Sequence, residues 1–145
     1  MKRIKILVIL LLLIRLAWID QREYKIPRRY LQGALGGRII LAMVELILDG
    51  RMAWKGILLE CVTAVFVMVL LTLIRCLSKG GIGIGDIRLL GVMAFFLGFS
   101  LTLKTLFYAM IVAFFQGIFS YGMFRKKKIP FVPALLGGMI AALLL

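Results

Sequence analysis

Two aspartates stand at the edges of apolar runs, where carboxylates can do chemistry. Asp20 follows a run that ends at Ile19, and Asp86 precedes one that begins at Ile87. An acidic group beside an apolar layer is costly enough to be a functional candidate. If both carboxylates reach one water molecule, their like charges do not ionise together, and the pair shares one proton. The ionised partner then takes a proton from the water, and the protonated partner donates toward a developing oxyanion.

A glycine-rich segment leads into the second aspartate and consists of Gly80, Gly81, Gly83 and Gly85. Without a Cβ, glycine lets another chain approach the backbone closely and adopts positive φ at little cost. Both properties suit a cleft for an extended peptide. Gly-Asp before an apolar run is also typical of a helix N-cap, and this alternative stays open for Asp86. Asp20, likewise, can simply mark the end of the first helix.

Three further acids have a plainer interpretation. Glu45 and Asp49 close an apolar run, and Glu60 lies about one helical turn inside the next. The cations Arg51 and Lys55 stand nearby in the sequence. Charges at helix ends commonly snorkel or form local ion pairs, so these three acids are not expected to take part in chemistry.

The apolar content indicates the fold class. Hydrophobic residues make up 63% of the 145 positions, against roughly 45–50% in a soluble domain. Because a spanning helix needs about 20 apolar residues, the chain holds about six spans and no separate soluble domain. The candidate spans are Ile4–Ile19, Leu31–Leu48, Ile57–Leu77, Ile87–Leu103, Thr105–Phe124 and Phe131–Leu145, with a break near Lys104. The prediction is an all-α polytopic bundle that forms a single membrane-embedded domain over residues 1–145.

The charge distribution indicates the partners. The net charge of +13 comes from clusters of Lys and Arg between the apolar runs. This pattern favours cytoplasmic loops that contact anionic headgroups, so we expect the lipid bilayer as a partner and no nucleic acid. With no His and only Cys61 and Cys76 as thiols, we expect neither a metal site nor a cofactor.

Positive charges near the span ends predict the orientation. Thirteen lie on the side of the two aspartates: Arg15, Arg22, Lys25, Arg28, Arg29, Arg38, Arg75, Lys79, Arg88, Arg125, Lys126, Lys127 and Lys128. Six lie on the other side: Lys2, Arg3, Lys5, Arg51, Lys55 and Lys104. The chain is thus predicted to be a multi-pass protein of the cell membrane, with Asp20 and Asp86 toward the cytoplasm.

Three blocks of sequence carry a family resemblance. They are Asp20 with Ile26-Pro27, then Gly83-Ile84-Gly85-Asp86 with Ile87-Arg88-Leu89-Leu90, then Ile129-Pro130-Phe131-Val132-Pro133-Ala134. Their types and order resemble the peptidase domain of type IV prepilin leader peptidases. The resemblance implies that Asp20 and Asp86 are the catalytic pair and that Gly83 and Gly85 belong to the active-site loop. It also implies a membrane aspartyl endopeptidase whose substrate is a prepilin-like membrane protein with a basic leader.

The chain departs from that family pattern at three positions. Arg28 stands where the family usually has Asn, Arg88 where it has Lys, and Val132 where it has Gly. Because Arg and Lys differ in geometry, a substrate-contacting role is not carried over to Arg88. Many members also carry an N-terminal methyltransferase half with a two-CxxC zinc site. This chain begins at the peptidase half, so cleavage without N-methylation is expected.

Four arginines, Arg22, Arg28, Arg29 and Arg88, surround the expected active site. A basic leader should avoid a mouth with this charge. These side chains are instead expected to bind lipid phosphates at the membrane edge.

Two other interpretations stay open. A presenilin-like intramembrane protease is suggested by the GxGD element and Pro133-Ala134-Leu135, but that group has Tyr where Ile19 stands. A non-enzymatic membrane transporter or assembly subunit is the other, with Asp20 and Asp86 as an ion relay. A relay favours carboxylates spread through the depth of the bundle, whereas these two are expected at one face.

Overall fold

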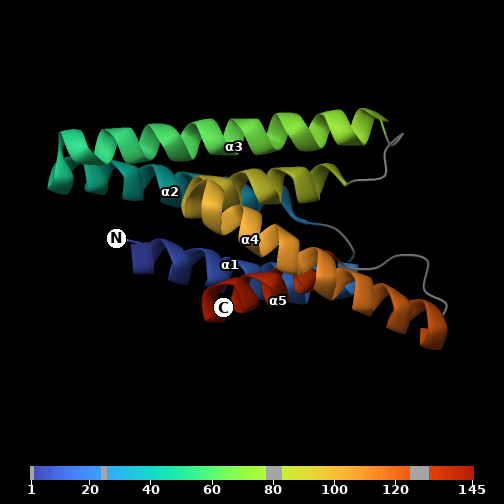
Figure 1. Cartoon of the computed structure of the whole chain (residues 1–145). Coiled ribbons are helices and arrows are strands. Elements are labelled where there is room, and N and C mark those ends of the chain that lie inside the picture. Colours follow the sequence, from blue (N-terminus) through green and yellow to red (C-terminus); the bar gives the residue numbers. More distant parts are fainter. Residues whose placement is uncertain (1, 24–25, 78–82, 125–130) are drawn as a thin grey trace. The chain divides into compact units, whose positions relative to one another are not determined.

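The computed structural model of the chain describes residues 2–23, 26–77, 83–124 and 131–145 (Figure 1). These residues form helices and no strand: α1 (Lys2–Glu23), α2 (Arg28–Asp49), α3 (Arg51–Leu77), α4 (Ile84–Phe124) and α5 (Phe131–Leu144). By length and composition, α2, α3 and residues Ile84–Phe119 of α4 can each cross a membrane, and α5 is a shorter apolar helix. The predicted all-α, polytopic membrane fold is confirmed.

The predicted break near Lys104 is wrong, and the count of six spans is not confirmed. α4 continues through Lys104, and its backbone departs from helical geometry at Gly98 instead, with φ 73° and ψ 177°. Glycine reaches this region because it has no Cβ to clash. A single exposed lysine, in contrast, does not interrupt a helix, since its side chain can extend away from the helix surface. The segment labelled α4 is therefore two helices that meet at Gly98, six residues before the predicted break.

The chain divides into two compact units. The first contains Met1–Ile9 and Pro27–Phe99, and the second contains Leu10–Ile26 and Ser100–Leu145. Helices α1 and α4 each contribute residues to both units. The single domain over residues 1–145 stays a prediction.

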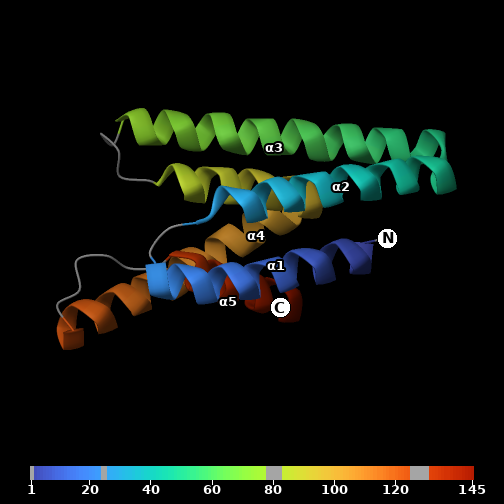
Figure 2. The same cartoon turned by 180° about the vertical axis from the view of Figure 1, so that it is seen from behind.

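The first unit is built around the α2–α3 pair. Both views show these two helices side by side and antiparallel (Figures 1 and 2). They are joined at Gly50, whose φ is 54° and whose N–H donates to the Leu46 carbonyl at 3.0 Å. Between α3 and α4, a Cβ built on Gly91 would lie 2.5 Å from the Met68 Cγ. Glycine at this position therefore lets the Met68 side chain pack directly on α4.

A buried cluster of four charges lies in the first unit. The Lys5 Nζ lies 2.9 Å from the Glu45 Oε1 and 2.7 Å from the Glu60 Oε1. The guanidinium of Arg38 lies 3.4 Å from the Glu45 Oε2 and also pairs with Glu60. Glu45 and Glu60 do form ion pairs, but the expected local pairing is wrong, because their partners are Lys5 of α1 and Arg38 of α2. Within the described residues, the nearby cations Arg51 and Lys55, at the start of α3, form no ion pair with them.

The placement of Arg38 among the charges near a span end is wrong. Arg38 lies in the middle of α2 and is fully buried. Its Nε donates to the Phe95 carbonyl at 3.0 Å, and its guanidinium lies 4.8 Å from the centre of the Phe95 ring. Carbonyls near a kink can accept from donors outside the helix, and Gly98 makes such a kink three residues later. Arg38 therefore drops out of the charge count, and the orientation stays a prediction.

The second unit pairs α5 with the second part of α4. A Cβ on Gly138 would overlap the backbone of Ala109, and a Cβ on Gly137 would lie 3.5 Å from the Val112 Cγ1. Small residues at a helix interface let two backbones approach closely, as they do in membrane bundles. This close packing fixes α5, and the first residues of α5 reach the candidate site.

Candidate active site

Asp20 lies near the C-terminal end of α1, one residue beyond the apolar run that ends at Ile19. The residue is buried, with 6% of its surface exposed. Its Oδ2 accepts a hydrogen bond from the N–H of Val132 at 3.2 Å. Val132 is the second residue of α5. The structure thus brings together the first and third blocks of the resemblance.

The N-terminus of α5 supplies an electrostatic environment for Asp20. The first N–H groups of a helix have no partner inside it, and the helix dipole places positive charge there. Because Pro133 has no N–H, Phe131 and Val132 are the donors within the first three residues of α5. Burial raises the pKa of the Asp20 carboxyl above its usual value, although the Val132 and Phe131 amides act in the opposite direction. A carboxyl of this kind keeps its proton to a higher pH than an exposed one.

Asp86 lies in the first turn of α4, and the N-cap alternative for it is wrong. The helix begins at Ile84, and the N–H of Ile87 donates to the Gly83 carbonyl at 3.2 Å. Asp86 therefore occupies the third helical position, where a carboxylate interacts favourably with the helix dipole. A Cβ built on Gly83 would lie 2.9 Å from the Asp86 Oδ2. Glycine at position 83 leaves the space that this carboxylate uses.

The other predicted site residues lie close to Asp86 in the chain. Gly83 is exposed, and Gly85 is partly exposed in the first turn of α4, as is Asp86 itself. Gly80 and Gly81 lie outside the described residues. Asp20 belongs to the second unit and Asp86 to the first, and their pairing around one water stays a prediction.

Sequence reasoning missed the contribution of α5. The amides of Phe131 and Val132 are the groups that act on Asp20. The available signal was proline at positions 130 and 133, because proline is favoured in the first turn of a helix. The first block also contains a helix start, since Pro27, with φ −68° and ψ 127°, directly precedes α2.

Comparison with known proteins tests the family resemblance of the three sequence blocks. A sequence model described as the type IV leader peptidase family matches residues 7–118, which include Asp20 and Asp86. The prepilin leader peptidase/N-methyltransferase of Bacillus subtilis (strain 168) is 30% identical over 77 residues. That match covers 51% of this chain and 31% of the relative. No solved structure matches the chain.

Proposed function

The chain belongs to the type IV leader peptidase family, and on that premise we propose that it is a membrane aspartyl endopeptidase. Its substrates would be type IV prepilins or pilin-like precursors, from which it removes the basic leader. The observation that carries this proposal is the hydrogen bond from the α5 amide of Val132 to Asp20. It supports a catalytic role for Asp20 because the amide at the start of α5 holds this buried carboxylate in one orientation.

In the proposed mechanism, Asp20 and Asp86 share one proton around a water molecule. The water attacks the scissile carbonyl carbon while the ionised aspartate takes a proton from it. The protonated aspartate donates its proton toward the oxyanion that forms. Proton transfer to the leaving amine then breaks the C–N bond and regenerates the pair. No covalent intermediate between enzyme and substrate forms in these reaction steps.

The site is proposed to act at the cytoplasmic face of the cell membrane. This assignment is supported by the count of positive charges near the predicted span ends, which remains twelve against six without Arg38. The substrate's apolar helix would lie in the bilayer beside the enzyme, with its basic leader in the aqueous phase. The family's methyltransferase half carries four cysteines in two CxxC motifs. The 145 residues of this sequence contain two cysteines, Cys61 and Cys76. We therefore propose cleavage without N-methylation by these residues.

A cleavage assay in detergent tests the proposal. The full chain is mixed with a purified prepilin-like precursor, and the leader-free product is followed by mass spectrometry. Asp20→Asn and Asp86→Asn should each abolish cleavage, whereas the matched control Asp49→Asn, at the exposed end of α2, should cleave normally. Cleavage by either active-site variant would overturn the shared-proton mechanism. With S-adenosylmethionine present, a methylated product would overturn the last part of the proposal.

A further inference from the structure

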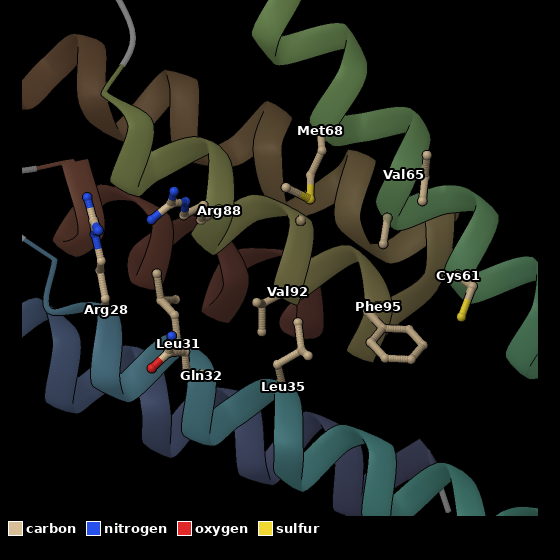
Figure 3. A pocket seen from close by; sticks show the side chains of 12 residues that line it. Arg28, Leu31, Gln32, Leu35, Cys61, Val65, Met68, Arg88, Val92 and Phe95 are labelled. Atoms are coloured by element: carbon tan, nitrogen blue, oxygen red, sulfur yellow. The ribbon is translucent and has the colours of Figure 1, made fainter.

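The first unit contains a pocket of about 600 Å³ between α2, α3 and the first part of α4 (Figure 3). Its wall is mostly apolar and includes Leu35, Val65, Met68, Val92 and Phe95. The proposed peptidase chemistry makes no use of these residues.

One end of the pocket is positively charged. Figure 3 shows the guanidinium groups of Arg28 and Arg88 at the same end, with Cys61 and Phe95 toward the other. Arg28 is the first residue of α2, and Arg88 lies in the second turn of α4. Both side chains are exposed, and within the described residues neither pairs with an acid. Arginine side chains near the ends of membrane-spanning helices generally reach toward the lipid headgroups.

We infer that this pocket binds one anionic phospholipid, with its phosphate between Arg28 and Arg88 and an acyl chain along the apolar wall. Guanidinium groups match phosphate oxygens in geometry as well as charge. Basic pockets between membrane helices on the cytoplasmic side are typical headgroup sites. The inference goes beyond the proposed function because it requires neither Asp20 nor Asp86.

The charge and the apolar wall of the pocket together favour a phospholipid over a leader peptide. A basic leader would meet like charges at Arg28 and Arg88. An acyl chain with a phosphate at one end matches both the apolar wall and the cationic end of the pocket.

The pocket is accessible from the bilayer. Leu35, Val65 and Met68 line it and keep 44%, 62% and 39% of their surfaces exposed. Apolar side chains on the outside of a membrane helix face lipid tails. A lipid can therefore enter sideways, with its tail between α2 and α3, while its headgroup stays at the membrane surface.

Native mass spectrometry of the full chain tests the headgroup site. The detergent-solubilised protein is offered phosphatidylglycerol or phosphatidylcholine with identical acyl chains. The wild type should retain phosphatidylglycerol preferentially, and Arg28→Gln and Arg88→Gln should each weaken it by about fivefold. Arg51→Gln, at the exposed start of α3, is the matched control and should retain the lipid as the wild type does. The inference would be overturned if the wild type retained the two lipids equally. It would also be overturned if the double variant Arg28→Gln/Arg88→Gln retained phosphatidylglycerol as well as the wild type does.

Photo-crosslinking tests the apolar wall and separates a lipid from other ligands. A phosphatidylglycerol with a diazirine on its acyl chain should label Leu35, Val65 or Phe95, and Ala64→Phe should reduce this labelling by filling the pocket. Inorganic phosphate should not compete. Displacement by phosphate, or by a prepilin-like peptide, would overturn the inference, as would labelling confined to residues outside the pocket. Neither readout uses peptidase activity, so this inference and the proposed function fail separately.

Discussion

Asp20 and Val132 lie 112 residues apart in the chain, yet the Asp20 Oδ2 accepts a hydrogen bond from the Val132 N–H at 3.2 Å. The contact ties the end of α1 to the start of α5. Because the donor is a backbone amide at a helix N-terminus, it keeps its direction as long as α5 keeps its packing on α4. The orientation of Asp20 therefore depends on Gly137 and Gly138, which allow that packing.

Removing the donor should weaken the site without removing the carboxylate. Val132→Pro deletes the N–H at a first-turn position that tolerates proline, and a lost hydrogen bond to a charged group costs about 1.5–3 kcal/mol. We expect kcat/KM for prepilin cleavage to fall by at least about tenfold. Val132→Ala keeps the N–H and serves as the control, so equal losses in the two variants would show that packing, not the donor, matters.

The stability of the protein should depend on pH through Asp20. Burial raises the pKa of its carboxyl above the usual value of 3.8. Stability contributed by the protonated form is therefore fully present below pH 3.8 and is lost as the pH rises through the raised pKa. The side chain in Asp20→Asn is neutral at every pH. The melting temperature of this variant should therefore equal that of the wild type at acid pH and exceed it at neutral pH. Thermal melts followed by circular dichroism check this, and Asp49→Asn should show no such divergence.

A methyl group at position 83 should disturb the second aspartate. In Gly83→Ala the new Cβ would lie 2.9 Å from the Asp86 Oδ2, so the carboxylate must move. We expect a clear loss of cleavage with unchanged helix content. Gly33→Ala, whose Cβ would meet no atom within 4 Å, should keep full activity and gain about 0.5–1 kcal/mol of stability. Normal cleavage by Gly83→Ala would show that the carboxylate position seen here is not needed.

The buried charge cluster should respond non-additively to substitution. Arg38→Gln leaves Glu45 and Glu60 with Lys5 as their remaining cation, and an uncompensated buried charge costs about 3–5 kcal/mol. Adding Glu60→Gln to Arg38→Gln restores neutrality and should recover part of that loss. A double-mutant cycle on the free energy of unfolding in detergent measures the coupling. Additive effects would mean that the four charges do not act as one group.

The sequence predicts the helices well where apolar runs are long, and poorly where one residue decides the geometry. Lys104 looked like a break but lies in continuous helix, whereas Gly98 carries the kink. Nothing local separates Gly98 from the other glycines, because its conformation depends on the packing around it. The central position of Arg38 was missed for a similar reason, since its acceptor Phe95 is 57 residues away.

The candidate site likewise has parts that the local sequence predicts and parts that depend on packing. Motifs were sufficient to nominate Asp20 and Asp86, because residue types and order carry that information. The role of α5 was not visible, since it arises from packing between segments far apart in the chain. Asp86 looked like an N-cap, but the helix begins two residues earlier, at Ile84.

The charge cluster of Lys5, Arg38, Glu45 and Glu60 contains two cations and two anions. A transmembrane potential does work of about 2.3 kcal/mol on each elementary charge per 100 mV. On a group whose charges sum to zero, that work cancels. The cluster can therefore hold α2, α3 and the start of α1 together in an energised or a depolarised membrane alike, whereas loss of any one member would make its stability respond to voltage.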